Sequence, residues 1–315
     1  MLTRKQIEDA QERLQNRIHR TPMLSSQTLN DKVGASIFIK AEHLQKTGSF
    51  KIRGAMNRVL KAKESGANHV VAASSGNHGQ AVAYAARSLG LAATIVVPET
   101  VIAAKEKAIK AYGGIVIQCG TTSEERLDYA QQVVKEITGA TYIPPYDDYE
   151  LMAGQGTVGL EILAQVKQAE VVVVPVGGGG LMSGVATAIK SMYPAIQVIG
   201  VEPDEANDTE QSIKAGKRLS IPAAQTIADG LRASVPGELT FPILQSNVER
   251  LLRVSDEAIR EACQFYLARM KQVVEPSGAV TLAALLAGKI DHQGGTVVLV
   301  ASGGNVDLES IGQLV

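Results

Sequence analysis

Short runs of apolar residues alternate along the chain with longer stretches in which apolar residues recur every three or four positions. The short runs are rich in valine and isoleucine and occupy residues 70–74, 93–97, 115–118, 171–176, 198–201 and 296–301. Nearly continuous Val/Ile strands separated by helices are typical of a parallel sheet with helices on both faces. We therefore expect an α/β fold in which parallel-rich, twisted sheets are covered by helices.

Two of the expected helices carry clear start signals. Thr3 and Gln6 have the spacing of a capping box and predict a helix over residues 3–16. Ser255 precedes two acidic residues, which predicts a helix that starts there and reaches residue 273.

The middle of the chain is less regular. Residues 156–168 predict a helix, whereas residues 202–236 predict mainly loop. The Pro-rich segment 142–148 breaks the alternation of strands and helices. A chain of 315 residues exceeds the usual size of one core, so we expect two domains that cross at this segment.

Composition excludes several classes of protein. The 31 Lys and Arg residues nearly balance the 32 Asp and Glu residues, which argues against a nucleic-acid or membrane-surface partner. Cys119 and Cys263 have neither a disulfide nor a metal spacing, so a reducing compartment is expected. Residues 1–20 are charged and lack a signal-peptide core, which predicts a cytoplasmic protein.

One uncharged run approaches the length of a membrane span. It covers residues 171–189 and contains Pro175 and four consecutive glycines. Glycine-rich backbone would leave polar groups unsatisfied in lipid, so a buried strand, a loop and a helix fit the run better.

The segment 46–54 contains the strongest candidate for chemistry. It places Lys51 between Gly48 and Gly54, directly after Phe50. A lysine amine bonds covalently to a carbonyl cofactor when it is held partly neutral, and glycines let the backbone approach a bulky group. The alternative is a solvated lysine in a Gly-rich turn. Lys51 is therefore a catalytic candidate only if the chain also supplies a cofactor site.

Gly177, Gly178, Gly179 and Gly180 follow a buried strand and precede a helix. Main-chain N–H groups at such a junction converge on an anion, usually a phosphate. A tight turn is the plain alternative, although a turn needs fewer glycines. A dinucleotide fingerprint is the other functional alternative, but the G-x-G-x-x-G spacing is missing, although Glu202 lies where a ribose partner is expected.

A second strand-to-helix junction consists of Ser74, Ser75, Gly76, Asn77 and His78. Its N–H groups and hydroxyls suit a carboxylate, which every amino acid presents. A helix cap with a turn explains the same residues equally well.

Two further polar segments follow strands. Ser302 ends the last strand, where a hydroxyl is well placed to meet a ligand. Glu202, Asp204, Glu205 and Asp208 form an acidic loop, which is either a solvated surface or a site for Mg²⁺ or Ca²⁺.

These motifs together resemble those of a known family. The segment around Lys51, the Ser-Ser-Gly-Asn-His loop at 74–78, the tetraglycine and the Ser-Gly-Gly-Asn-Val-Asp ending at 302–307 occur in the same order as in fold-type II pyridoxal-phosphate enzymes. Over almost its whole length the chain resembles the threonine/serine dehydratase (ammonia-lyase) and serine racemase group.

The resemblance implies a two-domain fold similar to the tryptophan synthase β subunit. A large cofactor-binding domain would comprise residues 1–43 and 147–315, and a small substrate-binding domain residues 44–146. It also implies pyridoxal 5'-phosphate as the cofactor and a homodimer.

The resemblance further implies roles at the cofactor. Lys51 would hold the cofactor covalently and take the proton from the substrate Cα, and Phe50 would pack beside the ring. The remaining cofactor contacts would be Asn77 at the phenolic oxygen, Gly177, Gly178, Gly179 and Gly180 at the phosphate, and Ser302 at the ring nitrogen.

It also implies two other groups of ligands. The substrate carboxylate would be held by Ser74, Ser75, Gly76, Asn77 and His78. A divalent cation, Mg²⁺ or Ca²⁺, would be held by Glu202, the carbonyl of Ala206 and Asp208.

The expected reaction is the dehydration and deamination of L-threonine and L-serine to 2-oxobutanoate or pyruvate plus ammonia, with serine racemisation in the same site. A neutral Ser302 at the ring nitrogen makes the ring a weak electron sink, which suits rapid loss of a β-hydroxyl. Ser75 favours the racemase side, because its hydroxyl would return a proton on the face opposite Lys51. Serine racemase as the main activity and 3-hydroxyaspartate dehydratase remain the alternatives.

Overall fold

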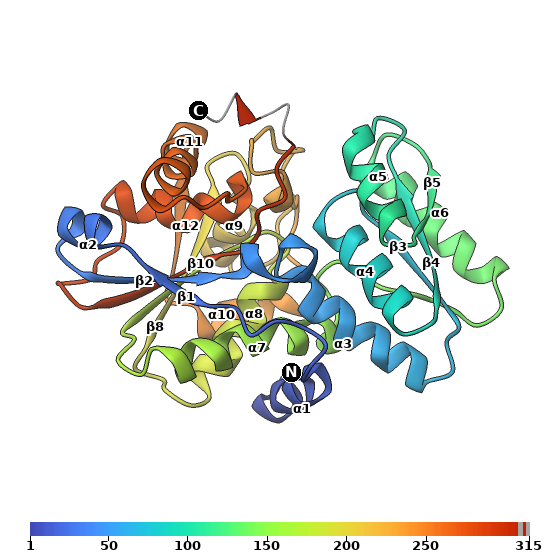
Figure 1. Cartoon of the computed structure of the whole chain (residues 1–315), viewed down its shortest axis with the longest axis horizontal. Helices are drawn as coiled ribbons and strands as arrows, with labels where there is room; N and C mark the ends of the chain where they lie inside the picture. Colours follow the sequence, from blue (N-terminus) through green and yellow to red (C-terminus); the bar gives the residue numbers. More distant parts are fainter. Residues whose placement is uncertain (308–310, 313–315) are drawn as a thin grey trace.

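A computed structural model of the chain describes residues 1–307 and 311–312. The described residues form two parallel-rich sheets, each with helices on both faces (Figure 1). This arrangement confirms the α/β fold expected from the Val/Ile runs.

The larger sheet has six strands in the order β1-β2-β10-β7-β8-β9. Only β1 runs antiparallel to its neighbour. The strands are β1 (Met23–Ser25), β2 (Ser36–Ala41), β7 (Val171–Pro175), β8 (Gln197–Pro203), β9 (Arg250–Val254) and β10 (Thr296–Ala301).

The smaller sheet is entirely parallel and has the order β5-β4-β3-β6. Its strands are β3 (His69–Ala73), β4 (Ala92–Val97), β5 (Ile115–Gln118) and β6 (Ala140–Tyr142). Because the carboxyl ends of parallel strands lie at one edge, the loops after β3, β7 and β10 are each presented at the edge where ligands bind in such sheets.

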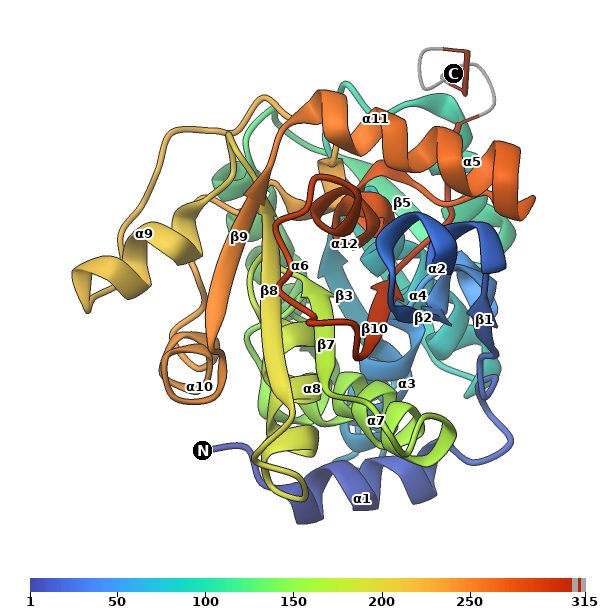
Figure 2. The same ribbon diagram turned by 90° about the vertical axis from the view of Figure 1, so that its left-hand side faces the viewer.

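Helices bury both faces of the larger sheet, as Figure 2 shows for α11 and α12 on one side and for α7 and α8 on the other. The helices associated with this sheet are α1 (Arg4–Leu14), α2 (Gln27–Val33), α7 (Tyr149–Gln165), α8 (Gly180–Lys190), α9 (Asp208–Ala215), α10 (Thr240–Asn247), α11 (Asp256–Phe265) and α12 (Pro276–Leu286).

The smaller sheet packs one face against α3, α4 and α5 and the other against α6. These helices are α3 (Lys51–Glu64), α4 (Asn77–Ser88), α5 (Ala103–Ala111) and α6 (Ser123–Glu136). Helices α3 and α7 cross closely at Gly54 and Gly154. A Cβ at Gly154 would lie 2.5 Å from the carbonyl oxygen of Arg53, so only glycine permits this crossing between the two halves.

The capping predictions at both ends of the chain are confirmed. Thr3 and Gln6 form the capping box of α1, and the Ser255 side chain accepts from the N–H of Ala258 to cap α11. The predicted end of that helix at residue 273 is wrong. After Phe265 the backbone continues as a π-helical turn, Tyr266–Met270, and Lys271 then adopts a left-handed φ of 57° that stops it.

Of two predictions for the middle of the chain, one is corrected and the other is confirmed. The helix expected at 156–168 begins at Tyr149, because the Asp148 side chain accepts from the N–H of Leu151 at 2.9 Å and caps it. The segment 202–236 is mainly loop, as predicted, and contains α9 and a short 3-10 helix at Asp229–Leu231.

The strands of the larger sheet lie within 23–41 and 171–301, and those of the smaller sheet within 69–142. The exact domain limits at 43/44 and 146/147 stay a prediction. Among the residues with described positions, no helix is both long enough and apolar enough to cross a membrane.

Candidate active site

Lys51 is the first residue of α3, at the end of the loop that leaves β2. Its amine Nζ donates to the carbonyl oxygen of Pro145 at 2.8 Å, and it lies 5.3 Å from the centroid of the Phe50 ring. Desolvation by the surrounding protein lowers the pKa of the amine to about 8, and the carboxylate of Glu275 opposes this shift. A substantial fraction of the amine is therefore neutral near physiological pH, as a nucleophilic lysine requires.

The loop before Lys51 is hydrogen-bonded to the chain that follows β10. The N–H of Phe50 donates to the carbonyl oxygen of Ser302 at 3.0 Å, and the N–H of Gly304 donates to the carbonyl oxygen of Gly48 at 2.9 Å. This pairing brings Ser302 close to Lys51, although the two residues are 251 positions apart in the sequence.

Thr47 in the same loop has a left-handed φ of 60°, which is rare for a β-branched residue. Its carbonyl oxygen accepts from Asn305 Nδ2 at 2.7 Å. The strained conformation is thus retained by a contact from the opposite end of the chain, a pattern common at functional sites.

A buried ionic cluster anchors the start of α3 behind Lys51. The Arg53 guanidinium donates to both oxygens of Glu42, at 2.7 and 2.8 Å, and to both oxygens of Glu161, at 2.7 and 2.9 Å. Lys40 Nζ donates to Glu161 at 2.6 Å. Because Glu42 belongs to the loop after β2 and Glu161 to α7, the cluster ties Lys51's helix to the larger sheet.

The tetraglycine joins β7 to α8 as the sequence predicted. The main-chain N–H groups of Gly177, Gly178, Gly179 and Gly180 make no hydrogen bond to any described residue. Free N–H groups at a helix N-terminus are the donors that an anion needs, so the junction fits a phosphate.

The glycines also have a steric reason within the protein itself. A Cβ at Gly178 would lie 2.4 Å from the ring of Tyr146, and Gly179 has a left-handed φ of 92°. The turn alternative therefore accounts for part of the glycine requirement, while the unpaired N–H groups favour a bound anion.

The loop after β3 presents the donors predicted for a carboxylate. The N–H groups of Ser75, Asn77 and His78 find no hydrogen-bond partner in the described part of the chain. Burial, followed by the nearby Lys51 charge, lowers the pKa of His78 to about 3, so its imidazole is neutral. Its Nε2 lies 2.9 Å from the carbonyl oxygen of Ile143, which fixes the ring.

Ser302 is 3% exposed at the carboxyl end of β10. Its hydroxyl makes one long contact, 3.5 Å to the carbonyl oxygen of Ser277. The hydroxyl is therefore available to a ligand group in the site, such as a ring nitrogen.

The end of β8 and the start of α9 bring two buried carboxyl groups together. Glu202 accepts from the N–H groups of Thr209 and Glu210 at 3.1 and 2.9 Å, whereas both oxygens of Asp208 are buried without a partner among the described residues. Burial raises the pKa of Glu202 to about 8, with a further contribution from Asp208, whose own pKa burial raises to about 7. Orphaned carboxylate oxygens of this kind suit a hard cation.

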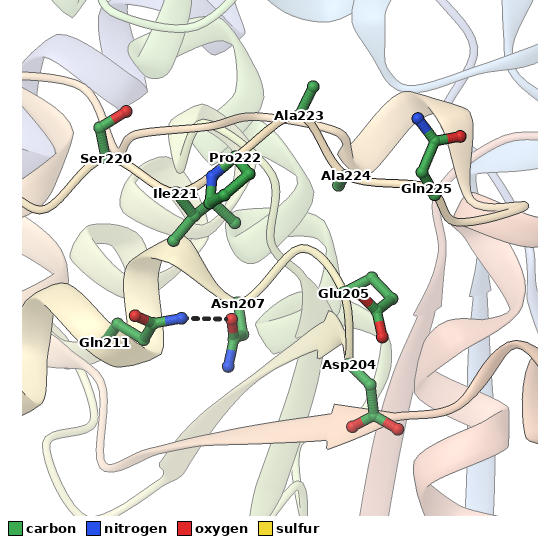
Figure 3. A pocket seen from close by; sticks show the side chains of 10 residues that line it. All are labelled: Asp204, Glu205, Asn207, Gln211, Ser220, Ile221, Pro222, Ala223, Ala224 and Gln225. Atoms are coloured by element: carbon green, nitrogen blue, oxygen red, sulfur yellow. Dashed lines mark hydrogen bonds between the residues drawn. The ribbon is translucent and has the colours of Figure 1, made fainter.

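No cluster of three or more His, Cys, Asp or Glu side chains within reach of one metal ion occurs in residues 1–307 and 311–312. The predicted set has two carboxylates and the carbonyl of Ala206, so the cation stays a prediction. A surface cavity of about 310 Å³ adjoins the acidic loop (Figure 3). It is lined by Asp204, Glu205, Asn207, Gln211 and residues 220–225. Neither Lys51 nor the two buried acids line it.

Sequence reasoning missed two residues that contact this site. Glu275 accepts from Asn77 Nδ2 at 2.7 Å, and the Tyr146 ring covers the tetraglycine. The Pro at the first position of α12 marked the helix start after Glu275, but nothing local indicated that its side chain turns away from that helix.

Comparisons with known proteins agree with this geometry. The family model described as pyridoxal-phosphate dependent enzyme matches residues 14–303. A serine racemase of Arabidopsis thaliana is 44% identical over 97% of this chain and 93% of that protein. The L-threo-3-hydroxyaspartate ammonia-lyase of Saccharomyces cerevisiae is 42% identical over 98% of this chain and 94% of that protein.

A solved structure extends the agreement to three dimensions. The crystal structure of a threonine deaminase from T.th. superposes with a TM-score of 0.92 at 42% identity, over 97% of this chain and 99% of that one. The fold-type II resemblance seen in the sequence is thereby confirmed, and the chain belongs to the family of pyridoxal-phosphate-dependent enzymes.

Proposed function

We propose that the protein is an ammonia-lyase that uses pyridoxal 5'-phosphate to dehydrate and deaminate L-threonine and L-serine. The products are 2-oxobutanoate or pyruvate, plus ammonia, and serine racemisation occurs in the same site. The observation that carries the proposal is the Lys51 amine, whose pKa lies at about 8, beside two loops with unpaired N–H groups. The threonine deaminase and serine racemase activities named for its relatives support this choice of substrates.

Each group of residues has a task in this reaction. The bound cofactor supplies an electron sink that makes the proton on the substrate Cα acidic. The neutral Lys51 amine accepts that proton, and the unpaired N–H groups at Gly177–Gly180 hold the phosphate. Residues 74–78 orient the substrate carboxylate, and Asn77 and Ser302 hold the ring at its phenolic oxygen and its nitrogen. The neutral Ser302 hydroxyl suits a reaction in which the β-hydroxyl leaves promptly.

The test is a substrate panel applied to the cofactor-loaded protein. L-Threonine, L-serine and 3-hydroxyaspartate are incubated separately, and the 2-oxo acid is assayed. We expect product from the first two substrates. Absence of product from both, with the cofactor bound, refutes the proposal, whereas product from 3-hydroxyaspartate alone selects the activity named for the yeast relative.

Racemisation is the second candidate activity, and Ser75 is the residue that favours it. The hydroxyl of Ser75 would return a proton on the face of the substrate opposite Lys51. Ser75→Ala should therefore abolish D-serine formation from L-serine while pyruvate formation continues. Ser88→Ala, at the far end of α4, serves as the matched control. Equal loss of both products in Ser75→Ala would contradict the assignment of opposite faces.

We further propose that Glu202, the Ala206 carbonyl and Asp208 hold Mg²⁺ or Ca²⁺. Support comes from the two unpartnered, buried oxygens of Asp208 next to Glu202. Removal of metal by a chelator should lower the melting temperature, and either cation should restore it. Asp208→Asn should abolish this response, whereas Asp204→Asn, an exposed acid of the same loop, should keep it. A melting temperature that changes neither with chelator nor with added cation would exclude the site.

We also propose a cytoplasmic homodimer, as the family resemblance implies. The two cysteines are both free thiols, which fits a reducing compartment. Light scattering after size exclusion tests the assembly, since a monomer would give a mass near 33.3 kDa.

A further inference from the structure

Glu275 is a buried carboxylate beside the site to which the mechanism above gives no role. It is 5% exposed and directly precedes α12, yet its side chain does not cap that helix. Its main chain is fixed at both ends. The N–H donates to the carbonyl oxygen of Gly303 at 3.1 Å, and the carbonyl accepts from the N–H groups of Gly278 and Ala279 at 2.8 and 3.0 Å. The carboxylate is therefore carried by a rigid piece of backbone.

The side chain of Glu275 contacts the loop after β3 and the chain that follows β10. Its Oε1 accepts from Asn77 Nδ2 at 2.7 Å. The same oxygen lies so close to Gly303 that a Cβ there would be 2.2 Å away. Glu275 therefore contacts Asn77, which is proposed to bind the phenolic oxygen, and Gly303, which follows Ser302, the residue proposed to face the ring nitrogen.

The orientation of the Asn77 amide follows from its two partners. The Asn77 Oδ1 accepts from Asn305 Nδ2 at 2.7 Å, and the Asn77 Nδ2 donates to Glu275. Asn305 Nδ2 also donates to the Thr47 carbonyl oxygen, which can only accept, so Asn305 presents an N–H to Asn77 Oδ1 and the Asn77 Nδ2 must face Glu275. One of the two N–H groups on Nδ2 has no partner among the residues with described positions, and it is free for the phenolic oxygen.

When ionised, Glu275 also acts on the charge of Lys51, because its carboxylate favours the protonated amine against the desolvation that lowers the pKa of that amine. Burial, and then Asp229 of the loop before α10, raise the pKa of Glu275 itself to about 8, and the hydrogen bond from Asn77 lowers it. The remaining titratable groups that face Glu275 are Lys105 from α5 and Cys263 from α11.

We propose that Glu275 is a positioning residue of the cofactor site. Its side chain holds the Asn77 amide with one N–H free for the phenolic oxygen of the ring, and in its ionised form it favours a protonated nitrogen at Lys51. The inference rests on the cofactor site proposed above.

The test compares Glu275→Gln with the unchanged protein, both loaded with pyridoxal 5'-phosphate. The substitution keeps the shape of the side chain and removes its ionisable carboxyl group. A pH titration of the cofactor absorbance should shift its midpoint down, because the ionised Glu275 carboxylate favours the protonated nitrogen. The cofactor dissociation constant should rise at least about fivefold, because a glutamine can present its NH₂ group to Asn77 and release the amide.

Glu275→Asp separates the two parts of the proposal. It keeps the charge but is one methylene shorter, so it loses the 2.7 Å contact with Asn77. The titration midpoint should stay within a few tenths of a pH unit of the unchanged protein, roughly as one kept charge implies, while the cofactor binds more weakly. If Glu275→Gln fails to fold, this variant decides, and unchanged cofactor affinity in it overturns the proposal.

The matched control is Glu170→Gln, which makes the same change at the opposite end of β10, where Glu170 accepts from the N–H of Thr296 at 3.2 Å. It should alter neither the midpoint nor the affinity. Unchanged values of both quantities in Glu275→Gln overturn the inference. Failure of the proposed function looks different, because the unchanged protein would then form no 2-oxo acid while the spectral shift in Glu275→Gln remains.

Discussion

Replacement of Arg53 by methionine should destabilise the protein strongly. The guanidinium is fully buried and donates to both oxygens of Glu42 and of Glu161. Methionine fills a similar length of space, so the change removes the charge and its hydrogen bonds rather than the packing. Glu161 retains its contact with Lys40 at 2.6 Å, whereas the Glu42 carboxylate keeps only the Thr21 hydroxyl as a hydrogen-bond donor among the described residues.

The expected loss of stability follows from the Glu42 carboxylate, which the substitution leaves buried without its ion-pair partner. Removing one partner of a buried ion pair costs about 3–5 kcal/mol, because the remaining charge stays buried. For a chain of this size each kcal/mol lowers the melting temperature by about 1.5 °C, so we expect a fall of roughly 5–8 °C. The loss should also reach the cofactor, since Arg53 lies two positions after Lys51 on α3.

Urea unfolding followed by circular dichroism measures the change, with the melting temperature as a second probe. Arg4→Met is the matched control, because Arg4 pairs with Glu8 on the exposed face of α1 and should change stability by less than about 1 kcal/mol. The double variant Arg53→Met with Glu42→Gln should recover much of the loss, since it leaves no ionised Glu42. A single variant within about 1 kcal/mol of the unchanged protein would refute the reasoning about this cluster.

Three further outcomes are expected. Lys51→Ala should lose the cofactor absorbance, whereas Lys46→Ala should keep it. The rate of cofactor capture by the unchanged protein should rise with pH and level off above about 8, where the Lys51 amine is neutral. A rate that does not depend on pH would contradict this. Gly178→Ala should weaken cofactor binding at least about tenfold, because the added Cβ would lie 2.4 Å from the Tyr146 ring. In a binding titration, the additional substitution Tyr146→Ala should restore part of the lost affinity. Burial opposes the ionisation of Glu42, but Arg53 outweighs burial and the pKa of Glu42 is lowered. The ionised Glu42 therefore stabilises the fold above its unfolded pKa of about 4.3, and this stabilisation is lost as the pH falls through the lower folded pKa. Urea unfolding midpoints measured from pH 7 to pH 3 should show the loss.

The sequence allowed the strands and several helix caps to be predicted, because these depend on neighbouring residues. The Val/Ile runs became the parallel strands, and Thr3 and Ser255 became caps. The start of α7 was missed because its cap, Asp148, lies in the Pro-rich segment 142–148 that we interpreted as a crossing between domains. Gly154, in the part of the helix that was missed, is required by close packing on α3. That constraint exists only after the helices have met.

The site shows the same division. Lys51 and the glycine junction stood out locally, whereas Glu275 did not, because its contact with Asn77 joins residues that are 198 positions apart. Likewise, Arg53 lies 108 positions from Glu161. The role of such a side chain depends on partners far away in the sequence. The residues next to Glu275 and Arg53 therefore gave no indication of their roles.

The hydrogen bonds between the Lys51 loop and the chain after β10 have a consequence for biogenesis. The lysine loop leaves the ribosome early, but its partners at Ser302 and Gly304 are made about 250 positions later. Contacts between residues so far apart in the sequence form slowly, because the long loop between them must close first. The small sheet can pair its strands during synthesis, since all four lie between His69 and Tyr142. A nascent chain therefore has its lysine long before it has a place for the cofactor, and capture of the cofactor reports that the final strand has docked.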